Sequence, residues 1–201
     1  APEIPVAIDP DINYWMVGSL VGDIEQRPRF IDDGVWENHN ENHAELVRSM
    51  KVGDRIAIRS RGAQTSGLPF DNFGQTVSKY YIHAIGTITA NSEDGTSVDV
   101  DWEEPGAVRE WYLYTLIGTV WRVPKDPASM GPHLIRFAFF GIPQDFEYFS
   151  EIWWPKESEK RRPEEDEPIP YSSEDVLKEG VFLTLPEVEL IIRRINTKRN
   201  V

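Results

Sequence analysis

Between Tyr14 and Val123 the chain consists largely of short runs of aromatic and β-branched residues, and turn sequences separate these runs. Residues of these types favour strands, and the runs occupy residues 14–19, 55–60, 80–90, 97–102 and 109–123. The polar turn between the third and fourth runs contains a glycine, which predicts a hairpin. Helical periodicity in this region is clearest at residues 40–50. Closely spaced strands with one inserted helix predict an α+β fold, built on a small β-barrel with flanking helices.

The sequence changes character after Pro124. Many aromatic residues and a break at Gly141 and Pro143 predict two short helices at 133–154 that dock on the barrel. The next segment is rich in charge and proline, which predicts a linker, and an amphipathic segment at 186–195 predicts another folded unit. We therefore expect four parts: a barrel at 1–127, docked helices at 128–154, a linker at 155–172, and at 173–201 the start of a further domain of a longer protein.

The charge of the chain is unevenly distributed. The net charge of −13 disfavours nonspecific binding to polyanions. Residues 48–61 reverse this sign, because Asp54 is the only acid beside five basic residues, Arg48, Lys51, Arg55, Arg59 and Arg61. A local basic strip fits contact with nucleic acid over a small area, and we expect its three strand residues, Arg55, Arg59 and Arg61, to contact phosphates. A solvated charged strand is the alternative.

The composition also bears on chemistry and location. The absence of cysteine excludes disulfides, thiol catalysis and cysteine-ligated zinc. No apolar run approaches the ~18 residues of a membrane span, and the N-terminal sequence lacks the pattern of a signal peptide. We therefore expect a cytoplasmic protein that does not bind membranes.

Two motifs resemble metal or phosphate sites without completing them. His39 and His43 have the spacing of two metal ligands on a helix, but no third ligand accompanies them. "GAQTSG" at 62–67 matches the start of a phosphate-binding loop, but Leu68 and Pro69 replace the required lysine and serine or threonine. We find no set of nucleophile, base and orienting group. The sequence therefore predicts a binding domain without metal, cofactor or catalytic activity.

Five segments in their order along the chain carry a resemblance to a known fold: "YWMVGS", "FIDDGVWEN", "MKVGDRIAIRS", "IHAIGTIT" and "VDVDW". Over about residues 13–123 they resemble the EVE-like and YTH-like branch of the PUA-type fold. The resemblance implies a compact β-barrel that holds a modified base in an aromatic cage. By position, Trp36 matches the cage tryptophan. Ser19 and Ser60 match positions that offer hydrogen bonds to the edge of the base.

The resemblance assigns the second wall of the cage less directly. The loop at 91–96 is too short to supply it, so we expect the insertion at 66–76 to provide Phe70 or Phe73. Trp36 itself has two interpretations. Its polar neighbours favour a stacking wall, with Asn38 available to bind the base, whereas a structural plug is the alternative. The other tryptophans that lie in strand patterns are assigned to the core: Trp15, Trp102, Trp111 and Trp121.

A second resemblance involves the C-terminal part of the chain. "EGVFLTLPEVELIIRRINTKRNV" is similar to the segment that leads into the AAA+ motor of McrB-type proteins, the NTP-driven subunits of modification-dependent restriction systems. "PHLIRFAFFGIPQDFEYF" also resembles helices that follow the sensor domain in such proteins. Together the two resemblances imply a sensor domain that binds modified double-stranded DNA and holds the modified base outside the duplex.

The motor domain absent from this sequence would then hydrolyse NTP, contact an McrC-like nuclease and mediate oligomerisation. Two other functions stay open on the sequence alone. One is a reader of methylated RNA, which the same fold would support. The other is a protein-interaction module that recruits a nuclease partner.

Overall fold

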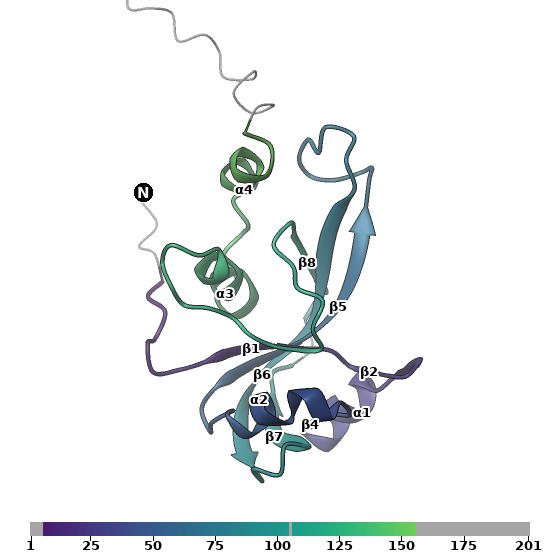
Figure 1. Cartoon of the computed structure of the whole chain (residues 1–201), viewed down its shortest axis with the longest axis vertical. Helices are drawn as coiled ribbons and strands as arrows, with labels where there is room; N and C mark the ends of the chain where they lie inside the picture. The colour runs from purple at the N-terminus through teal and green to yellow at the C-terminus, as the bar shows by residue number, and fades with distance from the viewer. Residues whose placement is uncertain (1–5, 105, 156–201) are drawn as a thin grey trace, which may run out of the picture. The chain divides into compact units, whose positions relative to one another are not determined.

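The computed structural model describes residues 6–104 and 106–155. The chain divides into two compact units, Ala1–Trp154 and Pro155–Val201. The first unit is α+β, and its described part contains one curled sheet, a small separate hairpin and four α-helices (Figure 1). From residue 156 onward, the predicted linker and the predicted start of a further domain lie outside the described residues.

A seven-stranded sheet forms the centre of this unit, in the order β4-β7-β6-β5-β1-β9, with β8 paired to another part of β6. Its strands are β1 (Tyr14–Val17), β4 (Val35–Glu37), β5 (Arg55–Gln64), β6 (Val77–Asn91), β7 (Ser97–Trp102), β8 (Arg109–Tyr112) and β9 (Val120–Arg122). β1 and β5 run parallel, and the other described pairs are antiparallel. Since no pairing between described residues joins β4 to β9, the sheet is a half-barrel rather than a closed barrel.

Most strand predictions are confirmed. β6 and β7 form the predicted hairpin. The run at 109–123 forms two strands, β8 and β9, with a loop between them. β5 extends to Gln64, so the first residues of "GAQTSG" belong to a strand and not to a loop. A second hairpin, β2 (Leu20–Val21) with β3 (Ile24–Glu25), was not predicted and projects from the body (Figure 1).

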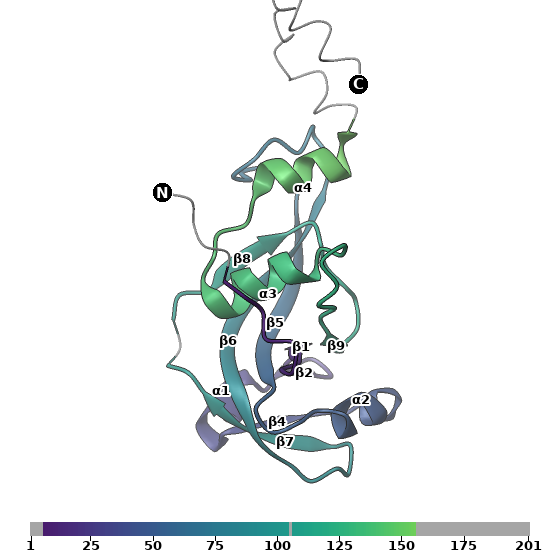
Figure 2. The ribbon, with the colours of Figure 1, turned by 90° about the vertical axis from the view of Figure 1, so that its left-hand side faces the viewer.

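The helices lie at two places on the sheet (Figure 2). α1 (Arg27–Asp33) and α2 (Ala44–Arg48), which follows a 3-10 turn at Glu41–His43, lie at the curled end. α3 (Gly131–Phe140) and α4 (Phe146–Trp153) lie along the other part of the sheet. Gly141, with φ 72°, ends α3 in the left-handed conformation that glycine adopts without strain, so the predicted break is confirmed.

Two hydrophobic cores occupy opposite faces of the sheet. The outer core lies under α3 and α4 and contains Tyr14, Met16, Tyr80, Trp111, Leu134 and Phe149. The inner core lies within the curl and contains Trp15, Val17, Phe30, Trp36, Ile56 and Ile58. The predicted core positions of Trp15 and Trp111 are confirmed, since both are 0% exposed. Trp102 and Trp121 are only partly buried and pack at the edges of the two cores.

A β-bulge in β6 changes which face its side chains occupy. The register passes from Ile58–Ala84 to Arg59–Ile82, which leaves His83 as an extra residue without a partner on β5. Before the bulge, Ile82 faces the outer core; after it, Ala84 faces the inner core. Bulges re-aim side chains, and they are common beside functional sites. The bulge therefore marks His83 and its neighbours as a candidate site.

Candidate functional site

Trp36 is part of the inner core. Its side chain is 0% exposed, and its indole N–H donates to the Gly18 carbonyl at 2.8 Å. β4 holds it beside β7, where it pairs with Val98. A ring without an exposed face cannot stack on a base. The cage-wall prediction is therefore corrected, and the structure supports the alternative, a structural plug.

Asn38 also has a structural role. Its side chain is 9% exposed, and its amide donates to the carbonyls of Asn40 and Gly95 at 2.9 and 3.1 Å. Its side-chain oxygen accepts from the Asn40 N–H at 3.0 Å. These bonds use the side chain to fix the turn after β4. This corrects the prediction that Asn38 binds the base.

Phe70 and Phe73 lie apart from Trp36. The Phe70 ring packs 5.0 Å from that of Phe146, and Phe73 packs 5.6 Å from Trp154, both centre to centre. Both phenylalanines contact the outer core, whereas Trp36 belongs to the inner core. They cannot form a cage together. The insertion at 66–76 instead caps the outer core beside α4.

The three arginines predicted to contact phosphates differ in accessibility. Arg59 is 5% exposed, donates to the Gly118 carbonyl and lies 4.8 Å from the centre of the Tyr80 ring. Burial lowers the pKa of its guanidinium. Arg55 is half-buried and forms an ion pair with Glu103. Arg61 is exposed. Only Arg61 is free to meet a phosphate, so the prediction is corrected for Arg59 and weakened for Arg55.

Ser60 and His83 form a polar pair beyond the rim of the inner core. Ser60 continues the row of β5 side chains that begins with Ile56 and Ile58, so it faces the same side. Its hydroxyl lies 2.7 Å from Nε2 of His83. The other ring nitrogen, Nδ1, is buried and has no hydrogen-bond partner among the described residues. Such an atom costs free energy unless a ligand or water pairs with it.

Tyr81 lies beside His83 on the same strand. The two rings are nearly parallel, with centres 6.5 Å apart and an angle of 23° between their planes. Gly62 lies against the Tyr81 ring: a Cβ at Gly62 would be 2.9 Å from Cε2. The ammonium of Lys79 lies 4.4 Å from the centre of the Tyr81 ring, and Lys79 is held in turn by Glu110 at 2.9 Å. Tyr81 and His83 therefore form a fixed, partly exposed aromatic pair.

The base of the β2–β3 hairpin completes the site. Partial burial alone would raise the pKa of Glu25, but a hydrogen bond from Ser19 and the nearby Arg27 lower it. Burial lowers the pKa of His83, and Arg27 lowers it further, whereas Glu25 acts in the opposite direction. The predicted base-edge residues Ser19 and Ser60 thus lie in one electrostatic neighbourhood, which also contains His83. We call the whole group, Ser19, Glu25, Arg27, Ser60, Tyr81 and His83, the Ser60–His83 site.

Few cations of the described residues are free to bind an external anion. Most Lys and Arg side chains donate to carboxylates or to backbone carbonyls, as Arg109 does to Phe137 and Lys125 to Ile12. Those without any side-chain hydrogen bond or ion pair within the described part are Arg27, Lys51, Arg61 and Arg122. Arg27 belongs to the Ser60–His83 site, and Arg61 follows Ser60 on β5. The site therefore combines partly exposed rings, an unpaired nitrogen and nearby free positive charge.

Sequence reasoning missed the central residues of this site, Tyr81 and His83. One signal was present: "KYYIH" places Lys79, Tyr81 and His83 at alternate positions of a strand, on the face opposite Tyr80 and Ile82. An aromatic residue among polar ones on an exposed strand face is a common sign of binding. The bulge that aims His83 has no signal in the sequence.

Other sequence motifs have different outcomes in the structure. His39 lies beside Glu37, with Nε2 3.3 Å from Oε2. Within 6–104 and 106–155, no group of three or more His, Cys, Asp or Glu residues is placed to hold a metal ion. No helix in this part of the chain is long and apolar enough to span a membrane.

Comparison with known proteins adds no relative. No protein-family model and no curated protein matches the chain.

Proposed function

We propose that the described unit is a PUA-type domain of the EVE-like and YTH-like branch, and that it binds DNA carrying a modified base. The extruded base would lie at the Ser60–His83 site. The curled sheet with helices at its end is compatible with this fold. The ordered resemblance of five sequence segments, described above, supports it.

The main support for the proposal is the environment of His83. His83 is aimed by a bulge, is held by Ser60, and keeps a buried Nδ1 that lacks a partner among the described residues. A nucleobase edge offers the complementary donor or acceptor. Tyr81 and the imidazole offer ring faces for stacking, worth about 1–3 kcal/mol per base. Extrusion of a base costs a few kcal/mol, so hydrogen bonds at His83, Ser60 and Ser19 are needed in addition to stacking.

A binding titration tests this function. The probes are duplexes that differ at one position: unmodified, 5-methylcytosine, 5-hydroxymethylcytosine, N4-methylcytosine or N6-methyladenine, with the matching single-stranded RNAs as a further arm. We expect one modified duplex to bind best, and Tyr81→Ala and His83→Ala to remove most of that preference. Tyr148→Ala, which truncates an exposed tyrosine on α4, is the matched control. Equal binding of all duplexes by the unaltered protein would contradict the proposal.

The wider role rests on the second sequence resemblance. We propose that the domain directs an McrB-like, NTP-driven restriction subunit to modified DNA, and that the motor of this subunit acts with an McrC-like nuclease. This proposal implies that the 201 residues hydrolyse neither GTP nor ATP. It also implies that a longer protein containing the motor hydrolyses NTP faster with modified than with unmodified DNA. Equal stimulation by both DNAs would contradict the targeting role without affecting the binding proposal.

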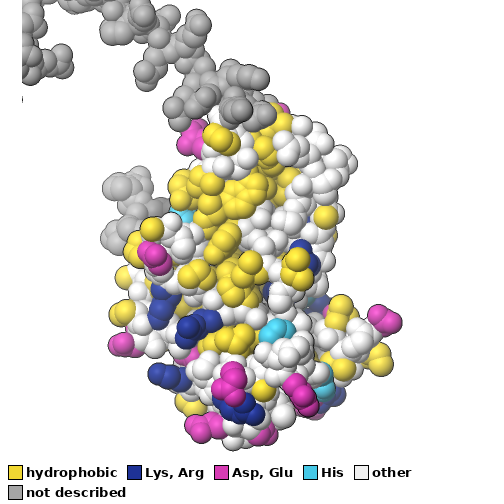
Figure 3. All heavy atoms as spheres, in the orientation of Figure 1, with side chains coloured by type: hydrophobic (Ala, Val, Ile, Leu, Met, Phe, Trp, Pro, Cys, Tyr) yellow, Lys and Arg dark blue, Asp and Glu magenta, His cyan; other side chains and the backbone are white. Residues whose placement is uncertain are grey.

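A protein-interaction module is the second candidate, and one surface favours it. Hydrophobic side chains gather over α3 and α4 (Figure 3), where the large exposed ones are Phe140, Tyr148, Ile152 and Trp153. These residues are separate from the Ser60–His83 site. Ile152→Ser combined with Trp153→Ser should leave DNA preference unchanged if the site proposal is right. Loss of nuclease recruitment in that variant would assign the recruitment to α4.

A further inference from the structure

Ile117 is unusually exposed for an isoleucine. At 80% it is the most exposed large hydrophobic side chain of the described residues, and its neighbour Leu116 is 42% exposed. Both lie in the loop at 113–119 between β8 and β9. An apolar side chain on a surface loop is ordinary by itself. This loop differs from an ordinary surface loop because buried side chains hold it through hydrogen bonds to its backbone.

Two buried side chains fix the loop on either side of Ile117. The Tyr80 hydroxyl donates to the Leu116 carbonyl at 2.7 Å and also accepts from the Leu116 N–H. The guanidinium of Arg59 donates to the Gly118 carbonyl. Arg59 also packs on the Tyr80 ring, so the two supports are joined. Ile117 is therefore held out between two anchored residues.

Holding the loop in this way costs free energy, because it requires a buried charge. A loop of purely structural function would not need such a support. Burial lowers the pKa of the Arg59 guanidinium, which means that the fold holds a charge in a place that disfavours it. Its Nε has no hydrogen-bond partner among the described residues. No carboxylate of the described part pairs with it. A rigidly presented apolar side chain is consistent with insertion into a partner.

The loop lies at the same end of the sheet as the Ser60–His83 site. Val17 pairs with Ile58 on β5 and with Val120 on β9. One residue further on, the Gly18 N–H donates to the Thr119 carbonyl at 2.8 Å. Ser19 and Ser60 therefore lie close beyond the point where the loop joins the sheet. The Ser19 end of the site therefore lies beside Thr119, two residues after Ile117 in the same loop.

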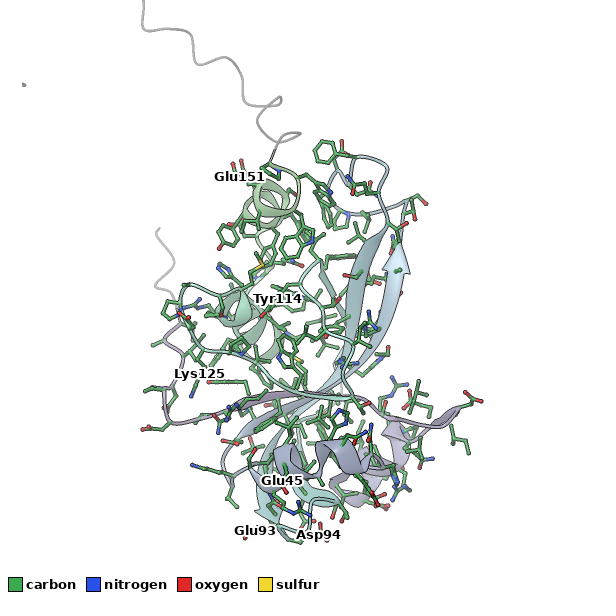
Figure 4. The ribbon with its side chains drawn as sticks, in the orientation of Figure 1. Glu45, Glu93, Asp94, Tyr114, Lys125 and Glu151 are labelled. Atoms are coloured by element: carbon green, nitrogen blue, oxygen red, sulfur yellow. The ribbon has the colours of Figure 1, made fainter. Side chains whose placement is uncertain are left out.

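The charge around the loop suits a polyanion. Residues 111–123 contain no Asp or Glu. Arg61 acts electrostatically on both Tyr80 and Arg59 and is one of the free cations. Figure 4 shows Tyr114 near the start of the loop, whereas Glu45, Glu93 and Asp94 gather at the far, curled end of the molecule. The loop thus combines an apolar tip with local positive charge.

We propose that Ile117 is a wedge that enters the base stack of duplex DNA when the modified base is turned out, while Arg61 meets an adjacent phosphate. Apolar side chains that part base steps in this way are a general device of DNA-bending and base-extruding proteins. The inference rests on the proposed function. It adds a residue that distinguishes duplex from single-stranded DNA, since a single strand has no stack to fill.

The test compares Ile117→Ala with Val52→Ala, a matched loss of an exposed aliphatic side chain that is 67% exposed and lies before β5. Each variant is titrated with the five duplexes named above and with their single modified strands. A 2-aminopurine beside the modified base reports unstacking. We expect Ile117→Ala to weaken binding of the preferred duplex about tenfold, which corresponds to about 1.4 kcal/mol, and to reduce the 2-aminopurine fluorescence, because the wedge no longer parts the base stack. Binding of the single strand should stay unchanged, and Val52→Ala should behave like the unaltered protein.

Two outcomes would overturn the wedge while leaving the base site intact. One is unchanged duplex binding by Ile117→Ala, including the case in which that variant instead loses a protein partner. The other is an equal loss on duplex and single strand. Failure of the base site has a different signature, because the unaltered protein would then show no preference among the five duplexes.

Discussion

Two indoles in the inner core each have an acceptor for their N–H. Trp36 donates to the Gly18 carbonyl, and Trp15 donates to Oδ2 of Asp54 at 2.9 Å. Asp54 is 2% exposed and also accepts from the backbone N–H groups of Asn13 and Lys51. The core thus contains buried polar groups that are satisfied. Removal of either indole ring therefore creates a cavity and also breaks a hydrogen bond.

Trp36→Ala should therefore destabilise the fold. We expect a loss of about 3–5 kcal/mol in the free energy of unfolding, the usual cost of truncating a fully buried large aromatic. Trp153→Ala, at 36% exposure on α4, is the control and should cost much less. Chemical denaturation measures both. An unchanged midpoint for Trp36→Ala, combined with lost base preference, would restore the cage-wall role.

Two histidines, His83 and His133, make the stability of the fold depend on pH. Burial lowers the pKa of His83 and of His133 below the ordinary value of 6.5. Arg27 and Arg136, respectively, add to this effect, whereas Glu25 and Asp145 oppose it. Just below the ordinary value, the unfolded chain binds more protons than the folded chain at these sites. The two histidines therefore remove stability as the pH falls through that window.

His83→Gln should make the melting temperature less sensitive to acid between about pH 7 and pH 5, because the substituted side chain takes up no proton in either state. His133→Gln should act in the same direction, and the double variant should be the least sensitive. Thermal melting at several pH values provides the measurement. A pH dependence that is identical in all three variants and in the unaltered protein would contradict the assignment.

At the scale of elements, β6 carries both the bulge and the aromatic pair. Two glycines that lie in the β5–β6 hairpin permit close contacts of different kinds. A Cβ at Gly62 would meet the Tyr81 side chain at 2.9 Å, whereas one at Gly86 would meet the Asp101 backbone oxygen at 2.7 Å. A side chain can move to make room, but a paired strand cannot.

Gly62→Ala should therefore shift Tyr81, weaken preference for the modified duplex and change stability little. Gly86→Ala should act in the opposite way, with a loss of about 1–3 kcal/mol of stability through overpacking. Denaturation and the DNA titration applied to both variants separate these effects. The same stability loss for both would show that Tyr81 is fixed as firmly as the backbone.

Strands were predictable from the sequence because aromatic and β-branched runs such as 80–90 have few other ways to bury their side chains. The division of their side chains between two cores was not, because the bulge at His83 reverses the alternation partway along β6. Ser19 and Ser60 were placed near the candidate site through a resemblance. Trp36 was assigned wrongly because its polar neighbours contact solvent or the turn after β4, whereas β4 directs the Trp36 ring into the inner core. Tertiary contacts of this kind leave no mark in a local window of sequence.

The net charge of the whole molecule, −13, opposes its binding to DNA. The acidic body repels the duplex, so the few free cations near the site should account for most of the salt dependence. Arg27→Ala and Arg61→Ala should each reduce the slope of log K against log salt by roughly 0.9 in magnitude, as expected for one phosphate contact. Arg59→Ala should leave the slope unchanged, because its guanidinium is buried, and should lower stability. Unchanged slopes for both Arg27→Ala and Arg61→Ala would move the DNA surface elsewhere.

β1 joins the two cores into one cooperative unit. Tyr14 and Met16 belong to the outer core and Trp15 and Val17 to the inner core, and none of the four is more than 1% exposed. Neither core can open without withdrawing this strand from the other. We therefore expect the buried amides of β1 to exchange their hydrogens only when the whole unit unfolds. Faster exchange in β1 than the global opening rate would mean that the two faces of the sheet melt separately.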